Sequence, residues 1–228
     1  MIPIKSISRY TCLLAISLLL GALPADAQRR KAEIQEPDTT AFFKGFAVSA
    51  DLIGPLQLLL SDYGQYEAAL RINLKDRWFP VFELGLGKAS HDDIVTKVIY
   101  KTSAPYGRVG LDFNLLKNKH DIYRLYGGFR YAYTNYKFEF SHPGVTDPVW
   151  KQEVEYGVKD IASYFHWVEG VIGIDASIIG PIHLGWSVRY RRRIAHKEDI
   201  YGKAWYVPGY GKTGATRLGG TFNVIIDI

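Results

Sequence analysis

The sequence predicts an all-β fold, an eight-stranded antiparallel up-and-down β-barrel. Three observations carry this prediction. Eight segments of about ten residues alternate apolar and polar side chains with a period of two. Short turns and long polar connections join these segments in strict alternation. The last segment keeps its alternation up to the carboxy terminus, as the closing strand of a barrel should.

The alternation fixes both the strands and their faces. In the second segment, Tyr66 and Leu70 share one face, and Glu67 and Arg71 share the other. The predicted strands cover residues 43–53, 66–74, 78–87, 106–115, 122–136, 162–176, 182–193 and 215–228. The long connections span about 54–64, 88–104, 138–161 and 194–213. In bacterial membrane barrels short turns are periplasmic and long loops extracellular, so both termini are expected in the periplasm and four loops outside.

The N-terminus has the features of a cleavable secretory signal. Lys5 and Arg9 precede an apolar run at 13–20, and Ala25-Asp26-Ala27 follows it. The run is shorter than the roughly 20 residues that a membrane-spanning helix needs. We therefore expect a signal peptide at 1–27, a flexible periplasmic lead-in at 28–41 and the barrel at 42–228. The only cysteine, Cys12, lies inside the signal, so thiol chemistry is not expected in the mature chain.

Charge and histidine placement argue against several function classes. The chain has 28 Lys and Arg against 23 Asp and Glu, spread along its length, so a nucleic-acid partner is not expected. The histidines His91, His142 and His196 have no partners at metal-ligand spacing. Asp62 with Asp92-Asp93 offers too few carboxylates for a calcium site. No cofactor, metal site or catalytic residue set is predicted.

Alternation alone fits two kinds of barrel, because a secreted lipocalin-like cup has its apolar face inside and a membrane barrel has it outside. Aromatic residues of the apolar face lie near the strand ends, as interfacial girdles would. They are Tyr66, Tyr133, Tyr164 and Tyr190 near the long loops, and Trp78, Phe113 and Tyr123 near the short turns. Glycine is frequent on the charged face, as a narrow lumen requires. The membrane barrel is favoured, and the secreted ligand-binding cup stays as an alternative.

The pattern over about residues 43–228 resembles the small eight-stranded outer-membrane barrels of the outer membrane protein A and X type. Within that group it is similar to an uncharacterised family of outer-membrane proteins common in Bacteroidota. The stretches that carry this second resemblance are Phe43-Lys44-Gly45-Phe46, Gly128-Phe129-Arg130-Tyr131, Trp186-Ser187-Val188-Arg189-Tyr190 and Val207-Pro208-Gly209-Tyr210-Gly211. The resemblance implies a multi-pass protein of the bacterial outer membrane. Its implied partners are outer-membrane lipid, lipopolysaccharide and the barrel-assembly machinery. One departure is the last residue, Ile228, where such barrels often end in Phe or Trp.

The polar faces of the strands, projected inward, place a set of charges in the barrel interior. These are Glu67, Arg71, Glu83, Arg108, Asp112, Arg124, Arg130, Glu169, Asp175, Arg189, Arg191 and Arg217. Buried charges are costly unless paired, and Arg suits bidentate pairing with carboxylates, so a salt-bridged interior is predicted. The set has seven arginines against five acids, and the two spare positive charges keep a narrow, gated, anion-preferring channel as an alternative. Against it, an eight-stranded barrel leaves an interior that side chains just fill.

Two further patterns lie near the loops. Arg191, Arg192, Arg193 and Lys197 form a basic rim that either binds lipid phosphates or gives the general compatibility with lipid that rim residues provide. Ser163 and His166 are three residues apart and therefore on opposite faces, which disfavours a nucleophile–base pair. We expect His166 in the lipid interface beside Tyr164 and Trp167.

The sequence therefore favours a monomeric, non-enzymatic barrel with a role in envelope structure or in surface interaction through its extracellular loops, whose surface ligand the sequence does not identify. The Tyr- and Pro-containing loops suit either ligand contact or closure of the barrel mouth. A lipid A or phospholipid-modifying barrel enzyme stays as an alternative.

Overall fold

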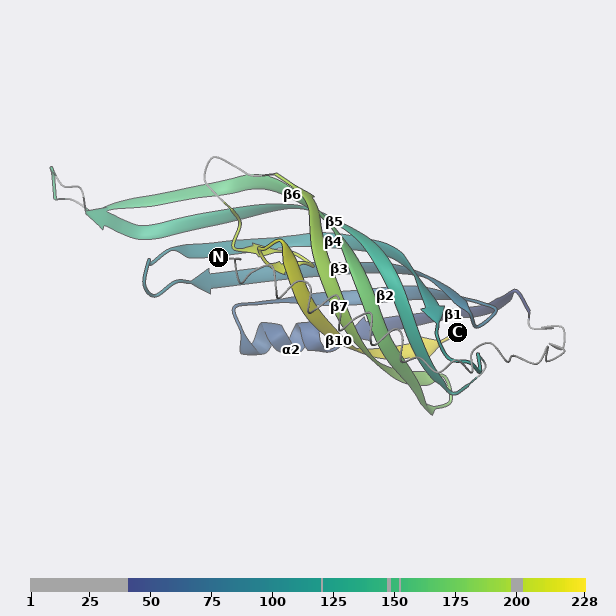
Figure 1. The fold of residues 1–228 in the computed structure, drawn as a ribbon. Coiled ribbons are helices and arrows are strands. Elements are labelled where there is room, and N and C mark those ends of the chain that lie inside the picture. Colours follow the sequence, from purple (N-terminus) through teal and green to yellow (C-terminus); the bar gives the residue numbers. More distant parts are fainter. Residues whose placement is uncertain (1–40, 120, 147–148, 152, 198–202) are drawn as a thin grey trace, which may run out of the picture. The chain divides into compact units, whose positions relative to one another are not determined.

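Eight antiparallel strands close into a barrel in the computed structural model of the chain (Figure 1). The structure describes residues 41–119, 121–146, 149–151, 153–197 and 203–228. The barrel strands are β1 (Phe43–Asp51), β2 (Tyr63–Leu74), β3 (Trp78–Asp92), β4 (Ile99–Asn114), β5 (Tyr123–Thr146), β6 (Glu153–Ile179), β7 (Ile182–His196) and β10 (Thr216–Asp227). Each strand pairs with its neighbour in the chain, and β10 pairs with β1 to close the ring. The predicted up-and-down barrel is confirmed; the predicted signal at 1–27 and the lead-in up to residue 40 lie outside the described residues.

One end of the barrel, which we call the turn end, has tight turns between β2 and β3 and between β6 and β7, and a longer connection, 115–122, between β4 and β5. Between β2 and β3, Lys75 and Asp76 adopt positive φ, 55° and 54°, as the two central residues of a type I′ turn do, and the amide of Arg77 closes the turn on the carbonyl of Leu74 at 3.1 Å. The amide N–H of Asp76 donates to the side chain of Asn73 at 2.9 Å, which fixes the turn. Gly180, with φ 54°, makes the turn between β6 and β7. The opposite end, which carries the long connections, is the loop end.

The middle of the barrel wall has an apolar exterior and a polar interior. Large exposed side chains of the exterior include Leu84 at 72 %, Ile172 at 64 % and Val188 at 63 %. The predicted tyrosines of the loop-end girdle, such as Tyr66 and Tyr190, also lie on the exterior. No helix in the described part of the chain is long and apolar enough to cross a membrane.

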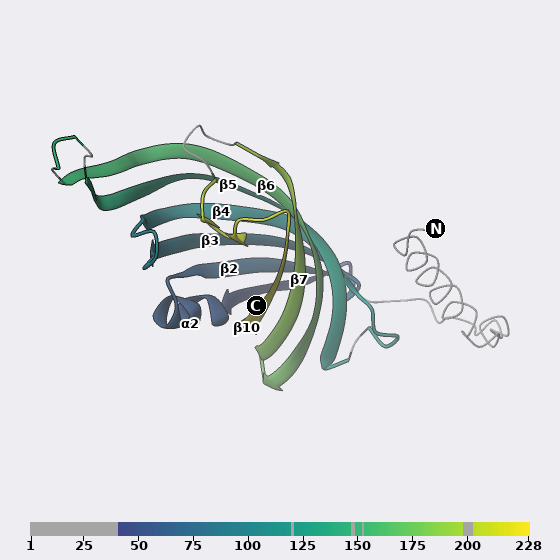
Figure 2. The ribbon, with the colours of Figure 1, turned by 60° about the vertical axis from the view of Figure 1, so that its left-hand side comes forward.

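Two of the predicted long loops are wrong, because the strands continue through most of them. β3 runs on to Asp92 and β4 begins at Ile99, within the predicted loop at 88–104; β5 and β6 likewise continue through most of 138–161. The β5–β6 hairpin projects beyond the other strands at the loop end (Figures 1 and 2). In these extensions the polar side chains lie on the exterior and the apolar side chains on the interior, the reverse of the pattern that predicts the strands. Lys88, Lys101 and Lys137 point outward, while Ala89 and Phe138 are buried, so an apolar exterior no longer identifies the strand.

The remaining two long connections contain short elements. The connection after β1 forms the helix α2 (Ile53–Leu60), which packs against β2. The connection after β7 forms a small hairpin of β8 (Tyr206–Val207) and β9 (Gly211–Lys212). Both elements lie at the loop end (Figure 2).

Glycines on the inward face make room for large interior side chains. A Cβ atom on Gly85 would lie 2.3 Å from the ring of Tyr106, and one on Gly128 would lie 2.0 Å from the carboxylate of Asp112. Real Cβ atoms do not approach this closely, so any larger residue would displace the interior group. The predicted glycine-rich inward face therefore reflects a packed lumen.

Candidate functional site: the ion-paired interior and its aromatic plug

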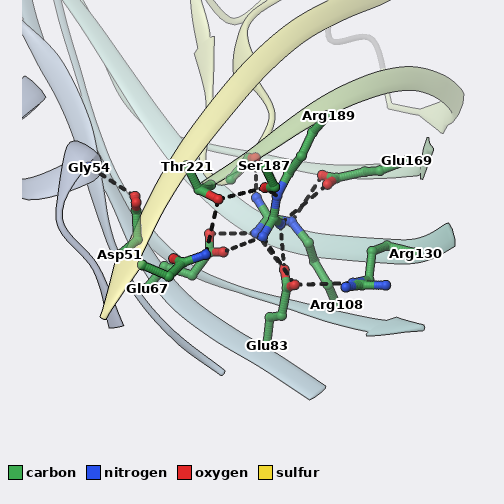
Figure 3. A network of polar contacts seen from close by, with 12 residues as sticks. Asp51, Gly54, Glu67, Glu83, Arg108, Arg130, Glu169, Ser187, Arg189 and Thr221 are labelled. Carbon is green, nitrogen blue, oxygen red and sulfur yellow. Dashed lines mark hydrogen bonds and ion pairs between the residues drawn. The ribbon is translucent and has the colours of Figure 1, made fainter. Parts of the chain in front are cut away.

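Glu83 of β3 lies at the centre of the interior network and binds three arginines (Figure 3). Its carboxylate accepts hydrogen bonds from Arg108 Nη1 at 3.0 Å, Arg130 Nε at 3.1 Å and Arg189 Nη1 at 2.6 Å. The three arginines come from β4, β5 and β7 respectively. One carboxylate on one strand thus ties three other strands together through charge-assisted hydrogen bonds.

Two further glutamates extend this layer toward the loop end. Arg108 Nη1 contacts Glu67 Oε2 at 2.5 Å, and its Nε lies 3.0 Å from Glu169 Oε1. Arg191 Nε lies 3.2 Å from the same oxygen of Glu169. The indole N–H of Trp167 donates to that oxygen at 2.6 Å. Glu169 therefore joins the ion network to an aromatic layer above it.

A second charged layer lies nearer the turn end. Asp175 Oδ2 accepts from Arg71 Nη1 at 2.6 Å and from Arg124 Nη2 at 2.7 Å. Asp112 binds both terminal nitrogens of Arg130 at 2.7 and 2.9 Å, a bidentate pair. The two layers share Arg130, which also contacts Glu83, so the charges form one continuous network.

Eleven of the twelve residues predicted for the interior lie in this network, and Arg217 does not. Arg217 is on the inward face but nearer the loop end, where its Nε donates to the carbonyl of Lys212 at 3.2 Å. The network then holds six arginines and five carboxylates, so one spare positive charge remains instead of two. Nine of its eleven residues are buried, and the side chains of Arg71 and Arg124 are 11 % and 19 % exposed. Buried ions are tolerated only when paired in this way.

An aromatic plug closes the loop end of the lumen. We use this name for Tyr206, Val207 and Tyr210 of the β8–β9 hairpin, each exposed by no more than 1 %. The Tyr210 ring packs against Phe165 and Trp167 of β6, with ring centroids 4.7 and 5.8 Å apart. Burial raises the pKa of the Tyr210 phenol.

Backbone groups of the plug bind the charged layer directly. Arg108 Nη2 donates to the carbonyl of Gly209 at 2.7 Å, and Arg191 Nη1 donates to the carbonyl of Tyr210 at 2.9 Å. Gly209 has φ 80°, and a Cβ atom there would lie 2.5 Å from the ring of Tyr106. Only glycine fits this turn, and it lets the hairpin reach the arginines. Of the two roles left open for this loop, closure of the mouth is the one that the structure shows.

The predicted basic rim is only partly a rim. Arg191 is buried in the lumen and bound to Glu169, because its position on β7 faces inward. Arg192 and Lys197 are exposed, and Arg193 is partly buried. The structure therefore removes Arg191 from any lipid-facing set.

Ser163 and His166 point in opposite directions, and Trp167 is not beside His166. Ser163 is buried and its hydroxyl donates to the carbonyl of Lys197 at 3.0 Å. His166 lies on the exterior, 2.6 Å from the hydroxyl of Tyr131 and next to Tyr164. The expected place of Trp167 in the lipid interface is wrong, because the next residue of a strand faces the other side. Among the described residues, no group of three metal-binding side chains is close enough to hold an ion.

The aromatic layer of the interior is a feature that the sequence pattern does not predict. Tyr106, Tyr126 and Trp167 all face inward, whereas the girdle argument considers aromatic residues only on the apolar exterior. Their inward orientation could have been predicted from their positions along the strands, because each of them alternates with a lipid-facing residue on its own strand. Tyr206 and Tyr210 belong to a predicted loop, and only the contacts of the folded chain place them in the lumen.

Fold and interior together define a closed eight-stranded antiparallel barrel with an apolar exterior and an ion-paired, plugged lumen. The chain belongs to the family described as "Domain of unknown function (DUF6048)", whose model matches residues 7–227. No curated protein matches the sequence.

Solved structures of similar fold have low sequence identity to this chain. Neisserial surface protein A shares 11 % identity, with 82 % of this chain and 99 % of that chain covered and a TM-score of 0.45. A major outer membrane protein from Thermus thermophilus shares 12 % identity over 81 % and 98 % of the two chains, with a TM-score of 0.46. Ail, the attachment invasion locus protein of Yersinia pestis, shares 10 % identity over 80 % and 93 %, with a TM-score of 0.37.

Proposed function

We propose that this protein is a non-enzymatic barrel of the bacterial outer membrane, closed to ions, that supports the envelope and presents its loop end to the cell exterior. The observation that carries the proposal is the distribution of side chains across the barrel wall. The exterior between the two aromatic girdles is apolar, whereas the interior is ion-paired. A soluble barrel has the opposite arrangement, and soluble monomers rarely expose apolar patches beyond a few hundred Å². In this proposal the partners are outer-membrane lipid, lipopolysaccharide and the barrel-assembly machinery.

Closure of the lumen is supported at two levels. The Arg189–Glu83 and Arg71–Asp175 pairs each join strands on opposite sides of the ring. Above them the aromatic plug fills the mouth. An ion crossing the barrel would have to break charge-assisted bonds and displace the plug, which favours a structural barrel over the anion-preferring channel.

Planar-bilayer recording tests closure. The refolded full-length chain should insert without stepwise conductance, and a boiled sample serves as the control for detergent artefacts. Regular conductance steps that shift on neutralising Arg189 would overturn the closed barrel and favour the channel.

A surface role is supported by the hairpin tips at the loop end. Ile94 and Val95, between β3 and β4, are each 90 % exposed, and Trp150, between β5 and β6, is 76 % exposed. Beneath these tips the outward face carries Lys88, Lys101 and Lys137, so the tips lie beyond the apolar belt. Exposed apolar side chains outside lipid suit contact with a partner.

Trypsin treatment of intact cells tests this orientation. Cleavage after Lys97 and Lys151 is expected on intact cells, because both residues stand at the tips of the projecting hairpins. Cleavage only after the outer membrane is permeabilised would place the loop end in the periplasm and contradict the surface role.

A further inference from the structure

The barrel wall has a seam between β10 and β2 at the loop end, because β1 between them is short. β1 ends at Asp51, which pairs with Asn223, and its last pair with β2 is Ala50 with Ala68. β10 continues to Thr216 and β2 continues to Tyr63 without β1 between them. Unpaired strand edges are costly in a membrane, so something must cover this seam.

The helix α2 covers one side of the seam only. It lies directly on β2, where a Cβ atom on Gly54 would be 2.2 Å from the carbonyl of Gln65. Asp51 holds the start of the helix, because its carboxylate accepts from the amide of Ile53 at 3.2 Å. It also accepts from the amide of Gly54 at 2.9 Å (Figure 3). Toward β10 the last backbone bridge is from the amide of Leu52 to the carbonyl of Phe222 at 2.8 Å. Beyond that bond no backbone hydrogen bond joins α2 to β10 among the described residues.

A cavity of about 250 Å³ occupies the space between α2 and β10, and we call it the seam cavity. Its lining includes Gln57, Arg191, Lys212, Arg217, Gly219 and Gly220. Liquid water takes about 30 Å³ per molecule, so the space admits a group much larger than one water.

The seam cavity is positively charged. Lys212 Nζ lies over the rings of Tyr63 and Trp205, at 5.4 and 5.0 Å from their centroids, and pairs with no carboxylate among the described residues. The Nε of Arg217 donates a hydrogen bond to the carbonyl of Lys212. The two terminal nitrogens of Arg217 have no acceptor within the described part of the chain. The one carboxylate of the lining, Asp51, is already engaged by three backbone amides. The cavity therefore favours an anion.

The seam cavity also lies at the level of a membrane surface. Leu218, on its β10 side, is paired in register with Tyr190 of the loop-end girdle. Tyrosine girdles mark the depth of lipid headgroups. Leu218 of the lining is 73 % exposed, and Leu56 of α2 is 52 % exposed, so both elements that flank the cavity carry exposed apolar side chains.

We infer that the seam cavity binds the anionic headgroup of a membrane lipid, through Lys212 and Arg217, with the acyl chains held along Leu218 and α2. The basic side chains suit a phosphate, and the apolar sides suit the tails of the same molecule. This inference rests on the proposed membrane location. It assigns to the chain a specific lipid site, which the general apolar belt does not require.

Native mass spectrometry of the folded full-length chain in detergent tests the site, with phosphatidylglycerol as the probe. One phosphatidylglycerol should bind saturably, with phosphatidylcholine at least tenfold weaker. The double variant Lys212→Gln/Arg217→Gln should weaken phosphatidylglycerol by about tenfold or more, as loss of charge-assisted bonds predicts. The matched control Lys101→Gln removes an exposed basic residue on the outward face of β4, outside the cavity lining, and should change nothing.

A second variant keeps the test valid if the double variant does not fold. Gln57 of α2 lines the seam cavity, so Gln57→Glu keeps the size of the side chain and adds a negative charge that repels an anion. It should abolish the preference for phosphatidylglycerol while the unheated protein keeps its compact form in dodecyl sulfate. Equal binding of both lipids, no effect of either cavity variant, an equal effect of Lys101→Gln, or equally tight binding of inorganic phosphate would each overturn the inference. If one of these results is obtained while the unheated protein still migrates as a compact band, the lipid site is wrong but the proposed barrel function is not.

Discussion

Arg189 and Glu83 form a bidentate pair across the full width of the lumen. Arg189 Nη1 lies 2.6 Å from Glu83 Oε2, and Nη2 lies 3.2 Å from Oε1. Their strands, β7 and β3, are four places apart in either direction around the closed ring, so they face each other. The pair bridges a diameter of the barrel, and Arg108 and Arg130 add two further strands to the same carboxylate.

Glu83→Gln should strongly destabilise the barrel. The substitution keeps the shape of the side chain but leaves three buried guanidinium groups without their shared charge. Removing one partner of a buried ion pair costs about 3–5 kcal/mol. Urea unfolding of the protein in lipid vesicles would measure the change in the free energy of unfolding.

Asp160→Asn is the matched control for that substitution. Asp160 pairs with Lys137 at 3.1 Å, but the two side chains are 75 % and 66 % exposed. Exposed pairs contribute about 0–1 kcal/mol, and Asn tolerates the positive φ of this position. Equal losses for the two variants would contradict the central role of Glu83.

Trp167→Phe and Trp186→Phe should differ although the substitution is the same. Trp167 is fully buried and donates to Glu169, whereas Trp186 is 61 % exposed on the apolar exterior. Loss of a hydrogen bond to a buried charge predicts a cost of about 1.5–3 kcal/mol for Trp167→Phe. For Trp186→Phe we expect a cost below about 1 kcal/mol, because surface substitutions away from such contacts change little. The same urea titration measures the loss of unfolding free energy in both variants. A larger loss for Trp186→Phe would mean that the interior and exterior faces of the barrel wall are assigned the wrong way round.

Gly209→Val should release the aromatic plug without opening the strands. A side chain at this position collides with Tyr106, and the positive φ adds strain. Trypsin should then cleave after Lys212 in the folded variant, while the wild-type hairpin resists. Gly214→Ala, whose Cβ would meet only the carbonyl of Thr216 at 3.6 Å, should leave the hairpin resistant. A protected hairpin in Gly209→Val would show that the plug does not depend on this turn.

The connection between β3 and β4 should loosen in acid. The amides of Val95 and Thr96 donate to Asp93 Oδ1 at 2.9 and 3.3 Å, and these bonds lower the pKa of the Asp93 carboxyl below its ordinary value of 3.8. The pKa of Asp93 is therefore lower in the closed connection than in an open one. The ionised carboxylate stabilises the closed connection above pH 3.8, and this stabilisation is lost as the pH falls through the lowered pKa. The NMR shifts of the two amides should therefore titrate in that range.

Asp93→Asn provides the comparison for this titration. Its side-chain carbonyl still accepts from both amides but does not ionise in acid. The amide shifts of this variant should be independent of pH. An acid transition that persists in Asp93→Asn would assign the loosening to another group.

The middle of the barrel could be predicted well from the sequence because there one rule holds for all strands. Between the girdles the exterior is apolar and the interior polar, so residues such as Glu83 and Leu84 are assigned to opposite faces from spacing alone. Beyond Lys88 the exterior meets water and the interior becomes aromatic, so the pattern reverses and the rule wrongly predicts loops there. The rule assigns Arg217 to the inward face correctly, but Arg217 lies nearer the loop end than the network and donates to the carbonyl of Lys212 instead. The plug could not be predicted, since Gly209 reaches Arg108 only through contacts distant in the chain.

Electrophoretic heat-modifiability of the mature protein from the outer-membrane fraction tests the central claim most directly. A closed membrane barrel with an ion-paired lumen should resist dodecyl sulfate when unheated and migrate as a compact, faster band, then shift to its unfolded position after boiling. Recovery of the protein in the soluble periplasmic fraction, with the same mobility before and after boiling, would contradict the account.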